Sequence, residues 1–395
     1  MIQSMTDLCL PYAAYAGFAL AWAAHFFSVR TYSAMARLSK KQKAMQQPDD
    51  PKQEEPPVSV IIPACNEAEA LRRNLPAILE QDYGNYEVIV VNDASTDETE
   101  DLLKALETEY PHLYHTFIPP GSRYVSHERL ALTVGAKSAN HDWMLLTEAG
   151  CRPDSPKWIA AMAKHFHQDT QIVLGYANRQ QAKGLVSRKI IFYNLFHQAQ
   201  YLPWATRHRA YRCTPGNVAY RKSHFMSHKG FAEDVNLLGG AMEILVNRHS
   251  RKDNTEVAIT PEAKIIYTGK TSSKGWRTER AEYLETRRHF ARTFGYRTMY
   301  NLRQTLMLLY YLATIVATGW SVWQKEWIGT ATVALAFILL SVCKTLWFNR
   351  SARAVGERKF TLSFLWHELS VPLWAIRSWI EYHTNPRSRF YRKAF

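Results

Sequence analysis

Hydrophobic and polar positions between Pro57 and Asp101 follow the periods of a strand, a helix and a second strand. Residues 58–62 are a short apolar run rich in β-branched side chains, which predicts a buried strand. Apolar residues then recur at helical spacing from Leu71 to Leu79, and residues 87–91 form a second apolar run. This order predicts a parallel βαβ unit, in which ligands bind at the carboxyl ends of the strands.

Polar residues follow both predicted strands at the end where a ligand would bind. Asn66 is expected to cap the helix, with Glu67 and Glu69 in its first turn, where the helix dipole favours anions. The second strand runs directly into the turn of residues 92–97, which contains Asp93. We therefore expect an acidic side chain at the edge of the sheet where a nucleotide would lie.

Three long apolar runs predict membrane segments, at residues 8–29, 305–323 and 327–348. Each is close to the roughly 20 residues that a spanning helix needs. No Lys or Arg precedes the first run and several follow it, which argues against a signal peptide and predicts an N-out anchor. Residues 324–326 separate the other two runs, which predicts a helical hairpin, and a buried hairpin stays open as the alternative.

A fourth apolar run, Phe360 to Ile380, contains His367, Glu368 and Arg377 and has basic residues on both sides. If it spanned the membrane, one basic cluster would lie outside, against the positive-inside tendency. We therefore favour a helix lying in the membrane interface, and a third spanning helix stays open.

The net charge of +14 on 395 residues concentrates beside these apolar runs, at residues 30–43 and 350–393. Lys and Arg in such places are typical of the cytoplasmic side of a membrane protein and of contact with anionic headgroups. Because no recognition motif accompanies the charge, we expect no nucleic-acid partner. The five cysteines are scattered and odd in number, which argues against a disulfide framework or a zinc site and suits a reduced compartment.

The βαβ segment resembles the family 2 glycosyltransferases, which have the GT-A fold, an α/β fold with a Rossmann-like mixed sheet and flanking helices. The residues that carry the resemblance at its start are Pro63, Asn66, Glu67, Asp93, Ser95 and Asp97. The resemblance continues to about Phe290 and includes residues 129–132, 216–221 and 288–289.

Together with the apolar runs, the resemblance divides the chain into five parts. They are an N-terminal transmembrane anchor and basic flank at 1–45, a Pro-rich linker at 46–57, a GT-A glycosyltransferase domain at 58–303, a transmembrane hairpin at 304–349, and a basic loop, an interfacial or third transmembrane helix and a basic tail at 350–395. The protein is expected in the cytoplasmic (inner) membrane as a multi-pass protein with its catalytic domain in the cytoplasm.

The resemblance implies a nucleotide-sugar site built from strand ends and turns. Its expected residues are Pro63, Asn66, Glu67, Asp93, Ser95, Arg129, Gly216 and Asn217. Asp93 is expected to accept a hydrogen bond from a pyrimidine base, with uracil favoured, so the expected donor is a UDP-sugar.

A divalent cation usually neutralises the diphosphate of such a donor, held in this family by an Asp-x-Asp after a later strand. The matching residues are Glu148, Ala149 and Gly150, so one carboxylate is kept and the other is lost. We expect Glu148 to be the metal ligand and Mg²⁺ or Mn²⁺ to be held weakly, if at all.

An inverting transfer also needs a base that takes the proton of the acceptor hydroxyl. The family's acidic residues fall here on Ala241 and Met242, which cannot accept a proton, and Glu243 follows them. Glu243 is the better candidate base, and Asp234 is a second candidate that follows the Gly-Phe pair too closely.

The family's Gln-x-x-Arg-Trp or Gln-x-x-Arg-His element, which binds the diphosphate, corresponds to Glu285 through His289. Arg288 and His289 are kept, and the planar Arg288 guanidinium suits phosphate oxygens. Glu285 would repel a diphosphate unless it is paired. An amphipathic helix whose Arg-rich face lies on lipid headgroups stays open as the alternative.

Two functions follow from these residues. The first is a membrane-anchored inverting glycosyltransferase that moves a sugar from a nucleotide sugar to a lipid-linked or polysaccharide acceptor at the cytoplasmic face. The second is a catalytically inactive relative that binds nucleotide or glycan, or scaffolds a polysaccharide assembly complex with a partner transferase.

Overall fold

The computed structural model describes residues 2–45, 55–119, 126–182, 184–234, 237, 239–269, 272–291 and 293–384. These residues form a seven-stranded sheet of strand order β3-β2-β1-β4-β8-β6-β9 and a three-stranded sheet of order β5-β10-β7. The strands are β1 (Val58–Ala64), β2 (Tyr86–Asp93), β3 (Leu113–Ile118), β4 (Trp143–Leu146), β5 (Cys151–Pro153), β6 (Ile172–Gly175), β7 (Ala177–Arg179), β8 (Val218–Arg221), β9 (Thr255–Ala258) and β10 (Ile265–Tyr267). β3, β2, β1 and β4 run parallel, and β8 is antiparallel to both of its neighbours.

The central strands β1, β2 and β4 of the large sheet are largely buried, which is why they read as continuous apolar runs. Alternate residues of β1 enter two different cores: Val60 faces one and Ile61 the other. The first core is covered by α3 (Ala68–Asn74), α4 (Pro76–Leu79), α5 (Thr99–Glu109) and α7 (Trp158–Ala163). The second is covered by α6 (His127–Ser138), α8 (Leu185–Ala205) and α10 (Ala241–His249).

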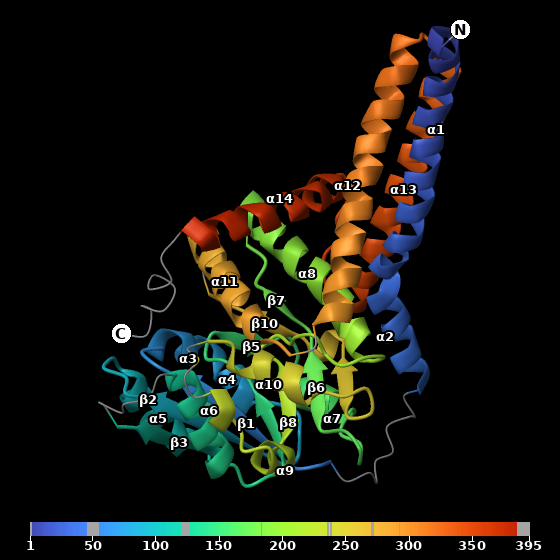
Figure 1. Ribbon diagram of the computed structural model, residues 1–395. Helices are drawn as coiled ribbons and strands as arrows, with labels where there is room; N and C mark the ends of the chain where they lie inside the picture. The colour runs from blue at the N-terminus through green and yellow to red at the C-terminus, as the bar shows by residue number, and fades with distance from the viewer. Residues whose placement is uncertain are drawn as a thin grey trace.

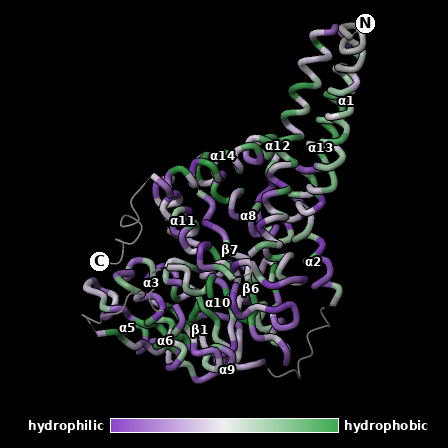
Figure 2. The backbone as a smooth tube through the Cα atoms, in the orientation of Figure 1, coloured by the Kyte–Doolittle hydropathy of each residue, from purple (hydrophilic) through white to green (hydrophobic). Residues whose placement is uncertain are grey.

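Three long helices rise from this α/β domain as an upright bundle (Figure 1). They are α1 (Ile2–Val29), α12 (Phe294–Trp323) and α13 (Trp327–Ala354). Among the described residues, α12 and α13 are long and apolar enough to cross a membrane. Apolar residues make up much of the bundle, whereas hydrophilic and hydrophobic residues alternate along the chain of the α/β domain (Figure 2).

The remaining helices join the bundle to the sheet or cover its ends. They are η1 (Arg30–Ser33), α2 (Ala34–Met45), α9 (Lys222–Ser227), η2 (Ala232–Asp234), η3 (Pro261–Ala263), α11 (Ser273–Thr286), η4 (Arg287–His289) and α14 (Ser363–Thr384). α14 crosses the face of the α/β domain from which the bundle rises and lies over α8 and α11 (Figure 1).

The mixed α/β sheet and the hairpin of α12 and α13 confirm these parts of the sequence prediction. The predicted helix cap is wrong by one residue, because Asn66 takes a left-handed φ of 53° and Glu67 occupies the cap of α3. The predicted boundary at 303/304 falls inside α12. The N-terminal anchor coincides with α1 and stays a prediction, while residues 46–54 of the linker and the basic tail at 385–395 lie outside the described residues.

Candidate active site

The carboxyl ends of β2, β1 and β4 bring three polar segments to one edge of the sheet. Ala64 of β1 pairs with Asn92 of β2, and Ile61 of β1 pairs with Leu146 of β4. Asp93 therefore ends one strand, the Asn66-Glu67 turn follows the central one, and Glu148 follows the third. Such an edge of parallel strand ends is where open α/β sheets bind ligands.

The turn after β1 and the turn after β2 are hydrogen-bonded to each other. The Asn66 N–H donates to Ser95 Oγ at 2.9 Å, and Asn66 Oδ1 accepts from the Thr96 N–H at 2.7 Å. Asp97 accepts from the Ala68 and Thr99 N–H groups, each at 3.1 Å, and so caps the starts of α3 and α5. Burial raises the pKa of Asp97, but these hydrogen bonds outweigh it and the net pKa is lowered. The hydrogen bonds of Asn66, Ser95 and Asp97 thus hold the two turns together at the edge of the sheet.

Asp93 is 6 % exposed and lies 2.9 Å from Nδ1 of His127, the first residue of α6. The sequence analysis did not select His127, because it lies 34 residues away and no local pattern links the pair. Pro63, at the end of β1, pairs with Val91 of β2 beside this contact.

Arg129 is buried, and its guanidinium holds the segment before α10. It donates to the carbonyl oxygens of Leu237 and Gly239, the latter at 2.9 Å, and to Ser126 Oγ at 3.2 Å. The structure therefore places Arg129 beneath the loop that leads to Glu243. Its expected contact with a donor stays a prediction.

Glu148 is half-buried at the end of β4, with the Tyr267 hydroxyl 3.5 Å from its Oε1. Burial raises the pKa of Glu148 to about 8, the charges of Glu128 and Glu67 add to the rise, and Arg179 opposes it. Burial likewise raises the pKa of Glu128 to about 7. Glu128 and Glu67 are therefore close enough to Glu148 for their charges to act on it, and a cation placed near Glu148 would favour its ionised form.

The described residues do not bring three or more His, Cys, Asp or Glu side chains together as a metal cage. A cation held on Glu148 would therefore take most of its ligands from water and the donor diphosphate, as Mg²⁺ commonly does. The Glu148 carboxylate fits one ligand position of such a cation, and the weak binding expected from the sequence motif stays a prediction.

Glu243 lies in the first turn of α10, where it forms an ion pair with Arg212, Nη2 to Oε1, at 2.6 Å. Burial raises the pKa of Glu243, and Arg212 opposes the rise. The charge of Glu243 also raises the pKa of Glu128, and the charge of Glu128 raises that of Glu148, so these carboxyl groups influence one another in sequence. Glu128 was not among the site residues predicted from the sequence.

Asp234, the second candidate base, forms a two-point ion pair with Arg248. Both N–O distances are 2.9 Å, and Asp234 is buried. This contact ties η2 to α10 and occupies both carboxylate oxygens. Its role as a base stays a prediction, and the contact favours Glu243.

Gly216, which precedes Asn217, lies next to Tyr267, whose hydroxyl also contacts Glu148. The Gly216 N–H donates to the Tyr267 hydroxyl at 3.2 Å, and a Cβ at this position would lie 2.6 Å from Cys151 Sγ. Asn217 is fully buried and donates to the carbonyl oxygens of Tyr176 and Ala263, each at 2.8 Å. These contacts join the residue before β8 to the segments that precede β7 and β10.

Arg288 and His289 lie in η4, at the end of α11. Glu285 is 3.7 Å from Arg288 Nη1 and 3.9 Å from His289 Nε2, and it also accepts from the Tyr382 hydroxyl of α14. The charge that would repel a diphosphate is therefore paired. Arg288 donates to Tyr382 as well, at 3.2 Å, so this element is joined to α14.

The arrangement of strands and site residues agrees with a GT-A-like glycosyltransferase fold. The structure is similar to that of the mannosyltransferase PcManGT from Pyrobaculum calidifontis, solved in complex with GDP-Man and Mn²⁺. The TM-score is 0.52 and the sequence identity 18 %, over 92 % of this chain and 99 % of the other. At this identity the likeness concerns the fold.

Residues 59–228 match the family model of glycosyl transferase family 2, which is a match over less than half of the chain. It is 30 % identical over 135 residues to the probable glycosyltransferase YdaM of Bacillus subtilis (strain 168), covering 34 % of this chain and 29 % of the relative. It is 43 % identical over 60 residues to the glycosyltransferase AglE of Haloferax volcanii, covering 15 % and 20 %. The chain thus spans less than a third of the length of these relatives.

Proposed function

We propose that this chain is a membrane-anchored inverting glycosyltransferase. It moves a sugar from a nucleotide sugar, with UDP as the favoured nucleotide, to a lipid-linked or polysaccharide acceptor at the cytoplasmic face. The observation that carries the proposal is the single sheet edge that brings together Asp93, the Asn66-Glu67 turn and Glu148. Glu243 is connected to this edge by its charge effect on Glu128, which in turn acts on Glu148.

The proposal assigns one chemical role to each of Asp93, Glu148 and Glu243, and the neighbouring residues are compatible with these roles. Asp93 accepts a hydrogen bond from the base, and His127 holds its carboxylate in place. Glu148 faces the diphosphate, and a divalent cation there would supply charge neutralisation of the leaving group. Glu243 takes the proton of the acceptor hydroxyl, and Arg212 favours the ionised form that a base requires.

The membrane part of the proposal rests on the bundle. α12 and α13 are apolar enough to span, and α1 lies along α12, so we assign it as an N-terminal anchor. α14 carries Trp366, Leu373 and Ile376 on its exposed side and lies across the base of the bundle, which suits a helix in the membrane interface (Figure 1). The α/β domain then lies at the cytoplasmic surface, within reach of a lipid-linked acceptor.

A second candidate function is favoured by one observation, the ion pair between Arg212 and Glu243. A carboxylate held in this way can serve structure alone, and Ala241 and Met242 offer no replacement base. The chain would then bind a nucleotide or glycan without turnover, as a scaffold for a partner transferase.

Two measurements separate these candidates. Calorimetric titration with UDP and GDP, with Mn²⁺ present, tests the nucleotide site, and Asp93→Asn should weaken binding about tenfold, as expected for a lost charge-assisted hydrogen bond. Release of nucleoside diphosphate from UDP-, GDP- and dTDP-sugars, with a membrane lipid extract as acceptor, tests turnover. Binding with release supports the enzyme, binding without release supports the scaffold, and no binding contradicts both.

A further inference from the structure

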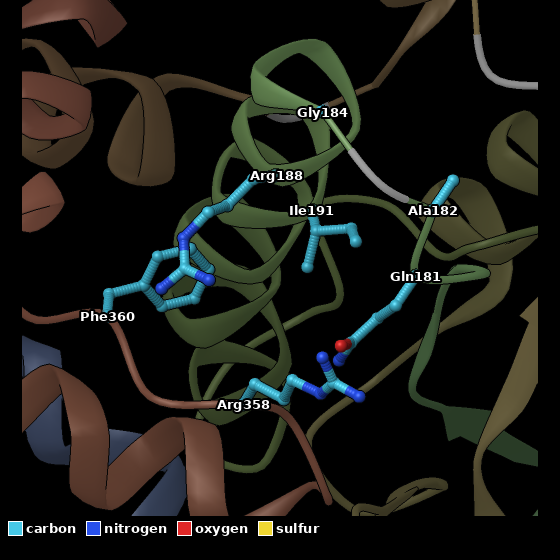
Figure 3. Close-up of a pocket in the computed structure, with 7 residues that line it drawn as sticks. All are labelled: Gln181, Ala182, Gly184, Arg188, Ile191, Arg358 and Phe360. Carbon is cyan, nitrogen blue, oxygen red and sulfur yellow. The ribbon is translucent and has the colours of Figure 1, made fainter.

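A pocket of about 440 Å³ lies between the start of α8 and the segment that connects α13 to α14. Gln181, Arg188, Ile191, Arg358 and Phe360 are among its lining residues (Figure 3). None of them belongs to the candidate active site. The pocket is therefore a separate feature of the molecule.

The pocket carries two guanidinium groups and has no carboxylate among its lining residues. Glu357, next to Arg358 in the sequence, is buried, and its Oε1 lies 3.0 Å from Lys264 Nζ. This acid is therefore paired inside the domain, although Lys264 also lies 3.6 Å from Asp154 and the other Glu357 oxygen accepts from Gln181 of the pocket at 3.4 Å. The pocket is left with a positive potential, which favours an anion.

The guanidinium group of Arg188 is held in place at the pocket by two contacts. Its guanidinium carbon lies 5.0 Å from the centre of the Phe360 ring, and Nη2 donates to the Lys359 carbonyl oxygen at 2.8 Å. The planar group has five N–H donors, so most of them remain for a ligand. Arg358 is exposed, and within the described part of the chain no acidic side chain pairs with it. Two arginines at one pocket suit phosphate oxygens.

Apolar side chains near the pocket in the sequence are unusually exposed. Leu185 begins α8 and is 84 % exposed, and Leu362, two residues after Phe360, is 96 % exposed. Trp366, one turn further along, is 73 % exposed. A soluble anion would leave these apolar side chains exposed to water, whereas the acyl chains of a lipid would cover them.

We propose that this pocket binds the phosphate of an anionic phospholipid headgroup, with the acyl chains against Leu185, Leu362 and Trp366. The lipid then joins α8 of the catalytic domain to the start of α14. This holds the domain at a fixed height on the membrane. The inference requires a membrane-associated protein and does not require transferase activity.

The test titrates the full chain, purified in a maltoside detergent, with dioctanoyl phosphatidylglycerol, dioctanoyl phosphatidylcholine and inorganic phosphate. The wild type should bind phosphatidylglycerol saturably and about tenfold more tightly than phosphatidylcholine, because only the phosphatidylglycerol headgroup carries a net charge. Arg358→Gln should weaken this binding about tenfold, the loss expected for one charge-assisted phosphate contact. Arg353→Gln is the matched control, since it removes the same charge from an exposed position outside the pocket.

Equal binding of both lipids would mean that only the acyl chains are recognised, and equal binding of inorganic phosphate would mean a free-phosphate site. Either result, or full binding by Arg358→Gln, overturns the proposal. Nucleotide titration of the same variant should be unchanged. A failure of lipid binding with intact nucleotide binding therefore concerns this pocket alone.

Discussion

Arg212 and Glu243 form a buried ion pair, with Nη2 2.6 Å from Oε1. The Arg212 guanidinium also lies 3.9 Å from the centre of the Tyr283 ring of α11, so α10 and α11 meet at this pair. Burial raises the pKa of the Glu243 carboxyl, and the arginine counters it. The pair can therefore keep a base ionised in a poorly solvated place, which is what general-base catalysis requires.

The first prediction concerns the identity of the base. Glu243→Gln should lower kcat at least about 100-fold, because the amide keeps the shape but cannot accept a proton. Asp234→Asn should cost about threefold or less, since the amide oxygen still accepts from Arg248. Steady-state kinetics on both variants checks this, with circular dichroism as the control for folding. A large loss in Asp234→Asn with an active Glu243→Gln would reverse the assignment.

The second prediction concerns the pH dependence of metal binding. Glu148 has a pKa of about 8, raised by burial and then by Glu128, Glu67 and Glu279 and opposed by Arg179. A metal binds the ionised form, so below pH 8 each unit should lower the apparent Mn²⁺ affinity by up to about tenfold. Titration with Mn²⁺ between pH 6 and 9 should show this rise and a plateau above pH 8. A flat profile, or the same profile in Glu148→Gln, would exclude Glu148 as the ligand.

The third prediction concerns stability. A carboxyl whose pKa is higher in the folded state holds a proton that the unfolded chain has already lost, so it makes stability fall as pH rises between about 4.5 and 8. Glu148→Gln removes this penalty and should raise the thermal midpoint at pH 8 more than at pH 5. Scanning calorimetry without metal at both pH values measures it. An equal midpoint change at both pH values would show that the Glu148 carboxyl is not perturbed by its surroundings.

The fourth prediction concerns the ion pair that joins α13 to α14. Lys344 Nζ lies 2.7 Å from Glu368 Oε2, both side chains are fully buried, and Glu368 also accepts from Tyr32 and Tyr311, each at 2.6 Å. Removing one charge leaves the other buried alone, so Lys344→Met or Glu368→Leu should cost about 3–5 kcal/mol. The double variant should be markedly more stable than the sum of the two losses predicts. Additive losses in denaturant unfolding would show that the two charges are not coupled.

The sequence predicts the central fold well because its patterns are local. The apolar runs of β1 and β2, the helical spacing from Leu71 to Leu79 and the hairpin of α12 and α13 each depend on neighbours along the chain. The polar turn at Asp93 lies at a strand end for the same reason. These features set the position of the candidate site before any tertiary contact is known.

Long-range pairs account for most of what the sequence did not predict. His127 meets Asp93 across 34 residues, and Arg212 meets Glu243 across 31, with no periodicity that links either pair. Only the packing of α6 and α10 against the sheet brings these side chains together. The left-handed φ at Asn66 is another example, because its partners Ser95 and Thr96 come from the turn after β2. Site geometry thus depends on tertiary contacts that single-sequence patterns do not contain.

The most direct test of the proposed transferase compares nucleoside diphosphate release by the wild type, Glu148→Gln and Glu69→Gln, with Mn²⁺ and the donor that binds best. Glu69→Gln is the matched control, because it removes the same charge from a side chain that is 95 % exposed on α3. The account predicts acceptor-dependent release by the wild type and the control, and a loss of at least about 100-fold in Glu148→Gln. Equal release by all three would contradict a metal site at Glu148, and no release by any of them with bound donor would contradict the transferase itself.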